Sequence, residues 1–188
     1  GFKKEYLVKT GLCYETDDHR LRDRFWGRVI FPVHTLSGKV VAFGGRVLSS
    51  ATNGVKVKYV NSPESEIYHK SSELYGIYFA KQAIVKQDRC FLVEGYTEVI
   101  SMHKSGVENV VASSGTALTP GQIKLIHRFT NNITVLYDGD VAGIKASLRG
   151  IDMLLEEGMN IKVCLLPDGE DPDSFARKHN ATEFQKFI

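Results

Sequence analysis

The 188-residue sequence predicts an α/β protein in which a basic α+β subdomain precedes a parallel sheet flanked by helices. Two observations lead to this fold class. β-rich runs dominate the first half of the chain, and strand-like and helix-like segments alternate in the second half. Residues 1–88 contain 14 Lys or Arg and 9 Asp or Glu, whereas residues 89–188 contain 10 and 13. We therefore expect two subdomains, 1–88 and 89–188, of opposite charge.

The clearest elements of the basic half are two β-rich runs with a hairpin signal between them. Arg28–His34 and Lys39–Arg46 contain mostly β-branched and aromatic side chains, and Leu36-Ser37-Gly38 separates them. A polar segment rich in Ser, Asn and Gly follows over 47–70. Residues 1–27 have a mixed pattern that predicts no particular element.

The second half alternates between short apolar runs and helical spacing. Strands are expected at 89–93, 109–112, 133–136 and 162–166. Helices are expected over 74–85, over 96–104, from a start signal at 119–122, and through 144–155. This alternation is typical of a parallel sheet with helices on both faces.

Acidic residues follow three of the four predicted strands. Glu94 ends the first, Asp138 and Asp140 follow the third, and the loop 168–173 follows the fourth. Ligands of parallel sheets bind at the carboxyl ends of the strands, and a hard cation such as Mg²⁺ relieves repulsion between neighbouring carboxylates. Singly, an Asp-Gly-Asp is usually a turn, and the loop could simply start a helix at Asp173. Together these acids favour metal-dependent phosphoryl chemistry.

Composition and the remaining motifs exclude several classes of protein. With 43% hydrophobic residues, the chain is not predicted to be disordered. It has no apolar run long enough to predict a membrane span. Three cysteines far apart in sequence predict buried thiols in a reducing compartment, hence the cytoplasm. Neither a P-loop nor a dinucleotide-binding glycine motif is present. The basic half could grip a polyanion, although most basic runs are ordinary solvated surface.

Three segments resemble the signature motifs of the Toprim domain, and the flanking segments resemble a narrower family. The signature segments are VEGYTEVI (93–100), YDGDVAG (137–143) and LPDGEDPD (166–173). The flanking segments are RVIFPVH, GKVVAFGGRVL, KYVNSPESEIYHK, LYGIYFA and ASSGTALT. In this order they resemble the RNA polymerase domain of bacterial DnaG-type primases, from about Arg22 to the end. Thr97 and Glu98 depart from the family's usual VEGYMDV, and Trp26 stands where relatives often have arginine.

The resemblance implies roles for individual residues. Glu94 would act as acid/base near the primer 3′-hydroxyl and as a metal neighbour, and Asp138 and Asp140 would be catalytic ligands of Mg²⁺ or Mn²⁺. Asp171 and Asp173 would support a second or third ion, and no organic cofactor is expected. The residues implied in binding template DNA and nucleotide phosphates are Arg28, Arg46, Lys58, Tyr59 and Lys70.

The resemblance therefore implies a DNA primase core: a nucleotidyltransferase that copies single-stranded DNA into short RNA primers from ribonucleoside triphosphates during replication. Expected partners are the template, the triphosphates, and a replicative helicase and single-stranded-DNA-binding protein that contact segments outside these residues. The expected location is the cytoplasmic replication fork, as part of the primosome. We expect the chain to begin inside the first subdomain and to end before a helical tail. The alternatives are a Toprim nuclease or topoisomerase fragment and a non-catalytic DNA-binding module.

Overall fold

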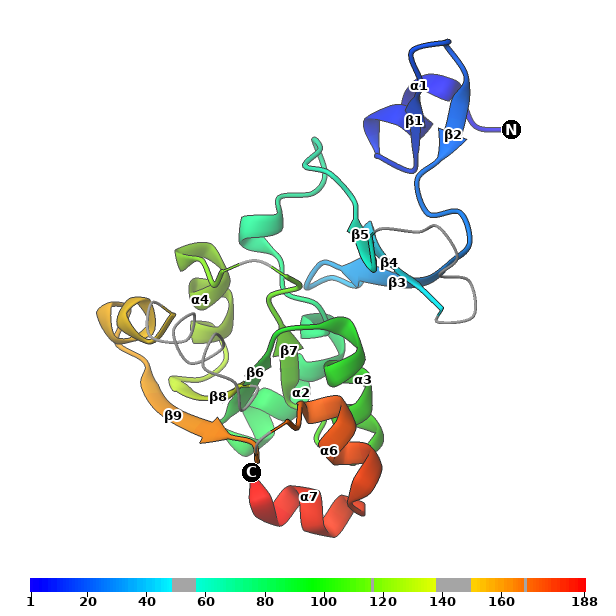
Figure 1. Ribbon diagram of the computed structural model, residues 1–188. Coiled ribbons are helices and arrows are strands. Elements are labelled where there is room, and N and C mark those ends of the chain that lie inside the picture. Colours follow the sequence, from blue (N-terminus) through cyan, green and yellow to red (C-terminus); the bar gives the residue numbers. More distant parts are fainter. Residues whose placement is uncertain (49–56, 116, 138–149, 168) are drawn as a thin grey trace. The chain divides into compact units, whose positions relative to one another are not determined.

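The computed structural model describes residues 1–48, 57–115, 117–137, 150–167 and 169–188 (Figure 1). These residues form two compact units, Gly1–Lys70 and Ser71–Ile188. Helix α2 (Ile77–Gln87) belongs to the second unit. The subdomain boundary at 88/89 stays a prediction.

The first unit contains two small antiparallel sheets. Helix α1 (Lys4–Lys9) precedes the hairpin of β1 (Cys13–Glu15) and β2 (Leu21–Asp23), three elements that the sequence pattern did not predict. The second sheet has the order β3-β4-β5, with bounds Arg28–His34, Val40–Val47 and Tyr59–Asn61. The hairpin expected around Gly38 is confirmed, and this glycine has the left-handed φ of 86° that the turn requires. The short 3₁₀ helix η2 (Lys70–Ser72) connects the two units in sequence.

The second unit is built on a four-stranded parallel sheet of order β7-β6-β8-β9. Its strands are β6 (Cys90–Val93), β7 (Val110–Ala112), β8 (Asn132–Tyr137) and β9 (Asn160–Leu165). Its further helices are α3 (Tyr96–Lys104), α4 (Pro120–His127), α6 (Pro172–Lys178) and α7 (Ala181–Phe187). Residues 150–156 are also helical. The predicted α/β class is thus confirmed.

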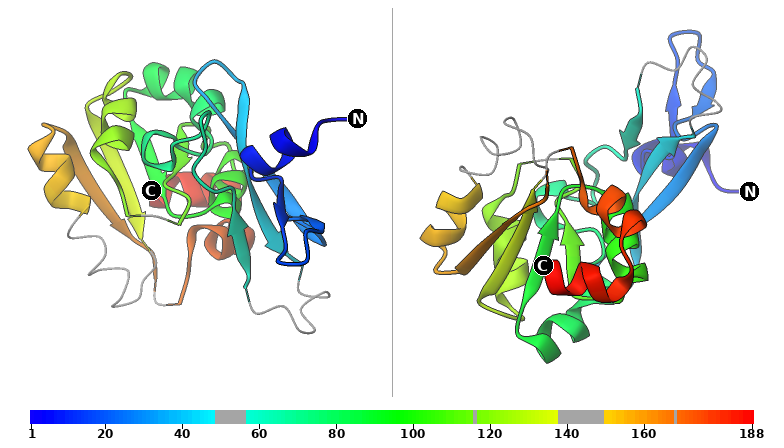
Figure 2. Two further views of the ribbon diagram at one scale, coloured as in Figure 1. Left: turned by 90° about the horizontal axis from the view of Figure 1, so that it is seen from above. Right: turned by 60° about the horizontal axis from the view of Figure 1, so that its bottom comes forward.

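Both faces of β6, β7 and β8 are buried, whereas the edge strand β9 is largely exposed. On one face, Phe91, Val93 and Leu136 pack against residues of α3, α6 and α7. Figure 2 shows α6 and α7, in orange-red and red, covering this face. The alternate strand residues on the opposite face are equally buried: Cys90, Leu92, Val111, Ile133 and Val135. Burial of both faces explains why the strands are continuous apolar runs.

The helix starts follow local capping chemistry. The capping box expected at Thr119 is present, because its hydroxyl accepts from the Gln122 N–H and the Gln122 side chain accepts in return. The start expected at Asp173 is wrong by two residues. Asp171 is the N-cap and Pro172 the first helical residue, which is the more stable arrangement because proline has no N–H to satisfy.

Two further expectations are corrected or limited by the structure. Only Cys90 is fully buried, which raises the pKa of its thiol, whereas Cys13 and Cys164 are partly exposed. The start of the helix expected through 144–155 lies outside the described residues. No helix in the described part of the chain is both long and apolar enough for a membrane span.

Candidate metal and nucleic-acid sites

Two of the three predicted acidic segments, Glu94 and the loop before α6, follow strands at the carboxyl edge of the sheet. β6 and β9 both neighbour β8 in parallel, so the residues that follow these strands meet at one edge. Glu94 directly follows β6, and the loop leading to α6 follows β9. Asp138 and Asp140 come directly after β8 in sequence and lie outside the described residues.

The backbone of Glu94 is held from both sides while its side chain stays exposed. Its N–H donates to Oε2 of Glu98 at 3.1 Å, and its carbonyl accepts from the N–H of Ser114 at 3.0 Å. Within the described residues, the Glu94 carboxylate has no hydrogen-bond or ion-pair partner. Its position is therefore fixed by the main chain, and both of its carboxylate oxygens can meet a ligand.

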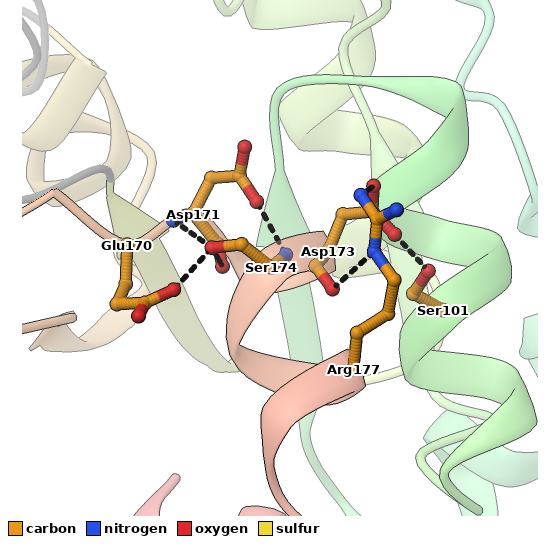
Figure 3. Close-up of polar contacts among 6 residues, drawn as sticks. All are labelled: Ser101, Glu170, Asp171, Asp173, Ser174 and Arg177. Atoms are coloured by element: carbon orange, nitrogen blue, oxygen red, sulfur yellow. Dashed lines mark hydrogen bonds and ion pairs between the residues drawn. The ribbon is translucent and has the colours of Figure 1, made fainter.

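Asp171 caps α6. Its Oδ1 accepts from the N–H of Ser174 at 2.6 Å, and its own N–H donates to the Ser174 hydroxyl at 3.0 Å (Figure 3). The neighbouring Glu170 accepts from Ser174 and pairs with Lys178, and the hydrogen bond from Lys178 is the main cause that lowers the pKa of Glu170. Asp171 thus uses one carboxylate oxygen for the cap.

Asp173 is the second residue of α6, and two side chains contact its carboxylate. The hydroxyl of Ser101, from α3, donates to Oδ1, and the guanidinium of Arg177 pairs with Oδ2 (Figure 3). The Asp173 side chain is 15% exposed, so this contact joins α6 to α3 at a mostly buried position. A role as a metal ligand would require Asp173 to exchange Arg177 or Ser101 for an ion.

The oxygen donors at this edge suit a hard divalent cation. Among residues 1–48, 57–115, 117–137, 150–167 and 169–188, no three Asp, Glu, His or Cys side chains lie together in a way that could hold an ion. The predicted ligand set therefore depends on Asp138 and Asp140 to join Glu94 and Asp171. The Glu94 carboxylate, which is exposed and has no partner in the described part of the chain, is the observation that fits such an ion best.

Two of the predicted nucleic-acid residues, Arg46 and Lys58, lie near the ring of a third, Tyr59. The Arg46 guanidinium lies 5.6 Å from the centre of the Tyr59 ring, and the Lys58 ammonium lies 6.0 Å from it. Arg46 and Tyr59 are direct cross-strand partners on β4 and β5. A phenol ring flanked by two cations can stack with a base while the cations contact phosphates.

Arg28 has a different environment. It pairs with Val47 in the β3–β4 register, so its side chain lies on the opposite face of the sheet from Arg46. Its guanidinium donates to the carbonyls of Gly45, Lys58 and Val57 at 3.0–3.3 Å. These bonds tie β3 to β4 and to the segment before β5, which is a structural role in addition to any contact with DNA.

Lys70 stands at the start of η2, and its N–H donates to Oε1 of Glu64 at 2.8 Å. Partial burial lowers the pKa of its ammonium, and the nearby Glu64 opposes this shift. The Glu64 carboxylate beside Lys70 would therefore repel a polyanion bound at this lysine.

Four residues that shape the acidic edge were missed from the sequence. Glu98 and Ser114 hold the Glu94 backbone, and Ser101 and Arg177 hold Asp173. Glu98 had a local signal, because it is the third residue of a helix whose N-cap is Gly95, the position from which a glutamate reaches back to a free N–H. Ser101 and Ser114 come from distant segments and had none.

Two family models match consecutive parts of the chain. The description "DNA primase catalytic core, N-terminal domain" matches residues 1–81, and "Toprim-like" matches residues 91–176. The chain belongs to the DnaG-type primase family. The two matches together cover nearly all of the chain.

Relatives agree with this membership. A DNA primase of Clostridium acetobutylicum is 45% identical over all 188 residues, which are 30% of the relative's length. A DNA primase domain from Pseudomonas aeruginosa has a TM-score of 0.90 and 39% identity, covering 100% of this chain and 59% of that one. A DnaG primase catalytic domain bound to single-stranded DNA has a TM-score of 0.87 and 40% identity, covering 97% and 58%. The chain thus spans about a third of the curated relatives it matches.

Proposed function

We propose that the chain is part of the catalytic core of a DNA primase, which synthesises short RNA primers on single-stranded DNA from ribonucleoside triphosphates. The observation that carries this proposal is the exposed carboxylate of Glu94 at the end of β6, which has no partner among the described residues. In the same sheet, β8 and β9 also lead into acids in the sequence. Acids at strand ends take part in several metal-dependent phosphoryl reactions. Membership of the primase family favours nucleotidyl transfer among them.

In this mechanism, Glu94, Asp138 and Asp140 would hold Mg²⁺ or Mn²⁺, with Asp171 and Asp173 supporting a second or third ion. The bound ions would supply charge to neutralise the triphosphate and would lower the pKa of the primer 3′-hydroxyl. Glu94 accepts the proton of that hydroxyl, which then attacks the α-phosphate as pyrophosphate leaves. The fixed backbone of Glu94 keeps the carboxylate in place for this transfer.

The template is bound by the first unit in this proposal. Arg46 and Lys58 contact phosphates, Tyr59 stacks on an unpaired base, and Lys70 and Arg28 add positive charge. The relative bound to single-stranded DNA supports the choice of template. A replicative helicase and a single-stranded-DNA-binding protein would act through segments outside these residues, at the replication fork in the bacterial cytoplasm.

A primer-synthesis assay tests this function. We expect labelled ribonucleotides to enter an RNA product only when single-stranded DNA, Mg²⁺ or Mn²⁺ and the full protein carrying this chain are present together. Cleavage of the DNA without RNA synthesis would instead assign a nuclease. DNA binding with neither reaction, and without any need for a metal, would assign a binding module.

Asp171→Asn separates the capping role of this residue from its charge. Asparagine is as good an N-cap as aspartate, so we expect the free energy of unfolding to change by less than about 0.5 kcal/mol. We expect primer synthesis to fall at least tenfold, because a ligand of the second or third ion loses its charge. Asp171→Ala, the comparison variant, should lose about 1 kcal/mol of stability as well. Normal synthesis by Asp171→Asn would remove this residue from the metal site.

The salt dependence of binding tests the DNA contacts of the first unit. We expect the affinity for single-stranded DNA to fall with salt at a slope of about −0.7 per phosphate contacted. Arg46→Ala, Lys58→Ala and Lys70→Ala should each reduce this slope by a fraction of a unit. Lys4→Ala, which removes an exposed lysine paired with Glu15, is the matched control and should leave the slope unchanged. Equal slopes for all variants would return these residues to ordinary solvated surface.

A further inference from the structure

A polar cavity opens at the end of the sheet opposite the acids. It has a volume of about 370 Å³, within the range of small-molecule pockets. Its lining residues surround the first residues of β6, β8 and β9, so it lies at the amino edge, opposite the acids. We name it the amino-edge pocket, and its polar lining includes Asp88, Arg89, Asn132, Thr134, Asn160 and Lys162.

Most of these side chains share one face of the sheet. Thr134 lies between Phe91 and Lys162 in the register of β6, β8 and β9. Asn132 and Asn160 are paired one step earlier on the same face, because residues two apart point to the same side of a strand. The guanidinium of Arg89 lies 4.5 Å from the centre of the Phe91 ring, so it belongs to this face too.

One lining residue, Thr134, has a buried hydroxyl with no hydrogen-bond partner among the described residues. Thr134 is 2% exposed, and its Oγ1 has no hydrogen bond in the part of the chain that the structure describes. Leaving such a group unsatisfied is unfavourable, and most buried hydroxyls in proteins are hydrogen-bonded. Because Thr134 lines a polar cavity, a ligand bound there would be able to supply the missing hydrogen bond.

The charges of the pocket favour an anion. Among the described residues neither Arg89 nor Lys162 pairs with a carboxylate, and the ring of Phe91 supports the Arg89 guanidinium. The one acid in the lining, Asp88, is already engaged, because it accepts from the Thr130 hydroxyl at 2.8 Å and from Nδ2 of Asn132 at 2.9 Å. Two cations against one satisfied carboxylate leave net positive charge.

The polar wall is also arranged in advance. Nδ2 of Asn160 donates to Oδ1 of Asn132 at 3.0 Å, and Asn132 in turn donates to Asp88. This chain of hydrogen bonds fixes the orientation of both amides. This part of the pocket wall is therefore ordered before a ligand binds, which lowers the entropic cost of binding.

We propose that the amino-edge pocket binds a phosphate group, either as free phosphate or as the phosphate of a small organic ester. The two cations match a phosphate dianion, and an arginine fork, an ammonium and a hydroxyl together offer enough donors for its oxygens. Ile133 and Ile161 add apolar lining, and the volume leaves room for an organic part beside the phosphate. The site is separate from the acids of the carboxyl edge and independent of the proposed catalytic role.

The test is a titration of the 188-residue chain with inorganic phosphate and with ribose 5-phosphate, at constant ionic strength, followed by the amide NMR shifts of β8 and β9. We expect saturable shifts at Thr134 and Lys162. Tighter binding of ribose 5-phosphate would assign an ester as the ligand, and equal binding would assign free phosphate. Ribose without phosphate should not bind, and equal shifts with ribose would overturn the proposal.

Two variants make the test specific. Thr134→Val removes the hydroxyl at almost constant volume, so we expect a midpoint of thermal unfolding that is equal or higher without ligand. We expect its phosphate affinity to fall roughly tenfold. Lys162→Ala should weaken binding by a similar factor, and Lys104→Ala, an exposed lysine of the same unit, should not. Unchanged affinity in Thr134→Val and Lys162→Ala, or phosphate shifts confined to the first unit, would contradict the assignment.

Discussion

Glu94→Gln is expected to lower the rate of primer synthesis by roughly 10²–10⁴-fold, the usual cost of losing a general base. The amide keeps the shape of the side chain and one carbonyl oxygen, but it does not accept a proton from the 3′-hydroxyl. Because the Glu94 side chain is exposed and its backbone is held by Glu98 and Ser114, we expect the fold to be unaffected. The rate of ribonucleotide incorporation is the measurement, with circular dichroism to check folding.

Two comparisons separate the base from a simple ligand. Glu108→Gln changes another exposed glutamate of the same unit and should leave the rate unchanged. Raising the Mn²⁺ concentration should not restore the rate of Glu94→Gln if its carboxylate accepts the proton. Recovery with added Mn²⁺ would reduce Glu94 to a metal ligand, and a normal rate without added metal would remove it from the site.

Phe175→Ala is expected to have the largest effect on stability, a loss of about 3–5 kcal/mol in the free energy of unfolding. Phe175 is 4% exposed and packs with the rings of His179, Phe184 and Phe187 at centroid distances of 4.0, 5.8 and 4.7 Å. This cluster holds α6 and α7 on the sheet, and the start of α6 carries Asp171. A loss of this size is a large fraction of the 5–15 kcal/mol typical of a protein.

Denaturant unfolding measures this loss. Phe79→Ala removes a ring of the same unit that is 58% exposed, and we expect it to cost less than half as much. Equal losses for the two variants would mean that the cluster around Phe175 does not anchor α6. At temperatures where Phe175→Ala stays folded, its primer synthesis should still fall, because the Asp171 loop loses its support.

The parts of the fold that were predictable from the sequence have strong local signals. The strands β6, β7 and β8 are short, mostly apolar runs because both of their faces are buried, and Thr119-Pro120 begins α4 through its own capping box. Glu94 was predictable as a candidate site residue because it is an acid at the end of such a strand, and its role stays a prediction. Helix α7 carried a comparable signal in Asn180 and Glu183, which form a capping box, and was overlooked.

Other features depend on contacts between distant segments, which periodicity does not reveal. Asp173 resembles a free acid in the sequence, yet Ser101, 72 residues earlier, donates to its carboxylate. Arg28 resembles a DNA contact, yet its guanidinium binds carbonyls 17 to 30 residues away. In both cases tertiary packing brings the hydrogen-bond partner to the charged group. The residue type therefore indicates the charge of the side chain but not which groups it contacts.

Mn²⁺ titration followed by paramagnetic broadening of amide NMR signals tests most directly whether the carboxyl edge of the sheet binds divalent ions. We predict that low Mn²⁺ concentrations broaden the amide signals of Glu94, Gly95 and Asp171, and that Asp138→Asn weakens this broadening. The signals of Asn132 and Asn160 at the amino edge should stay sharp. Absence of broadening at Glu94 and Asp171 while other acidic surfaces respond, or equal broadening in Asp138→Asn, would contradict the metal-dependent mechanism.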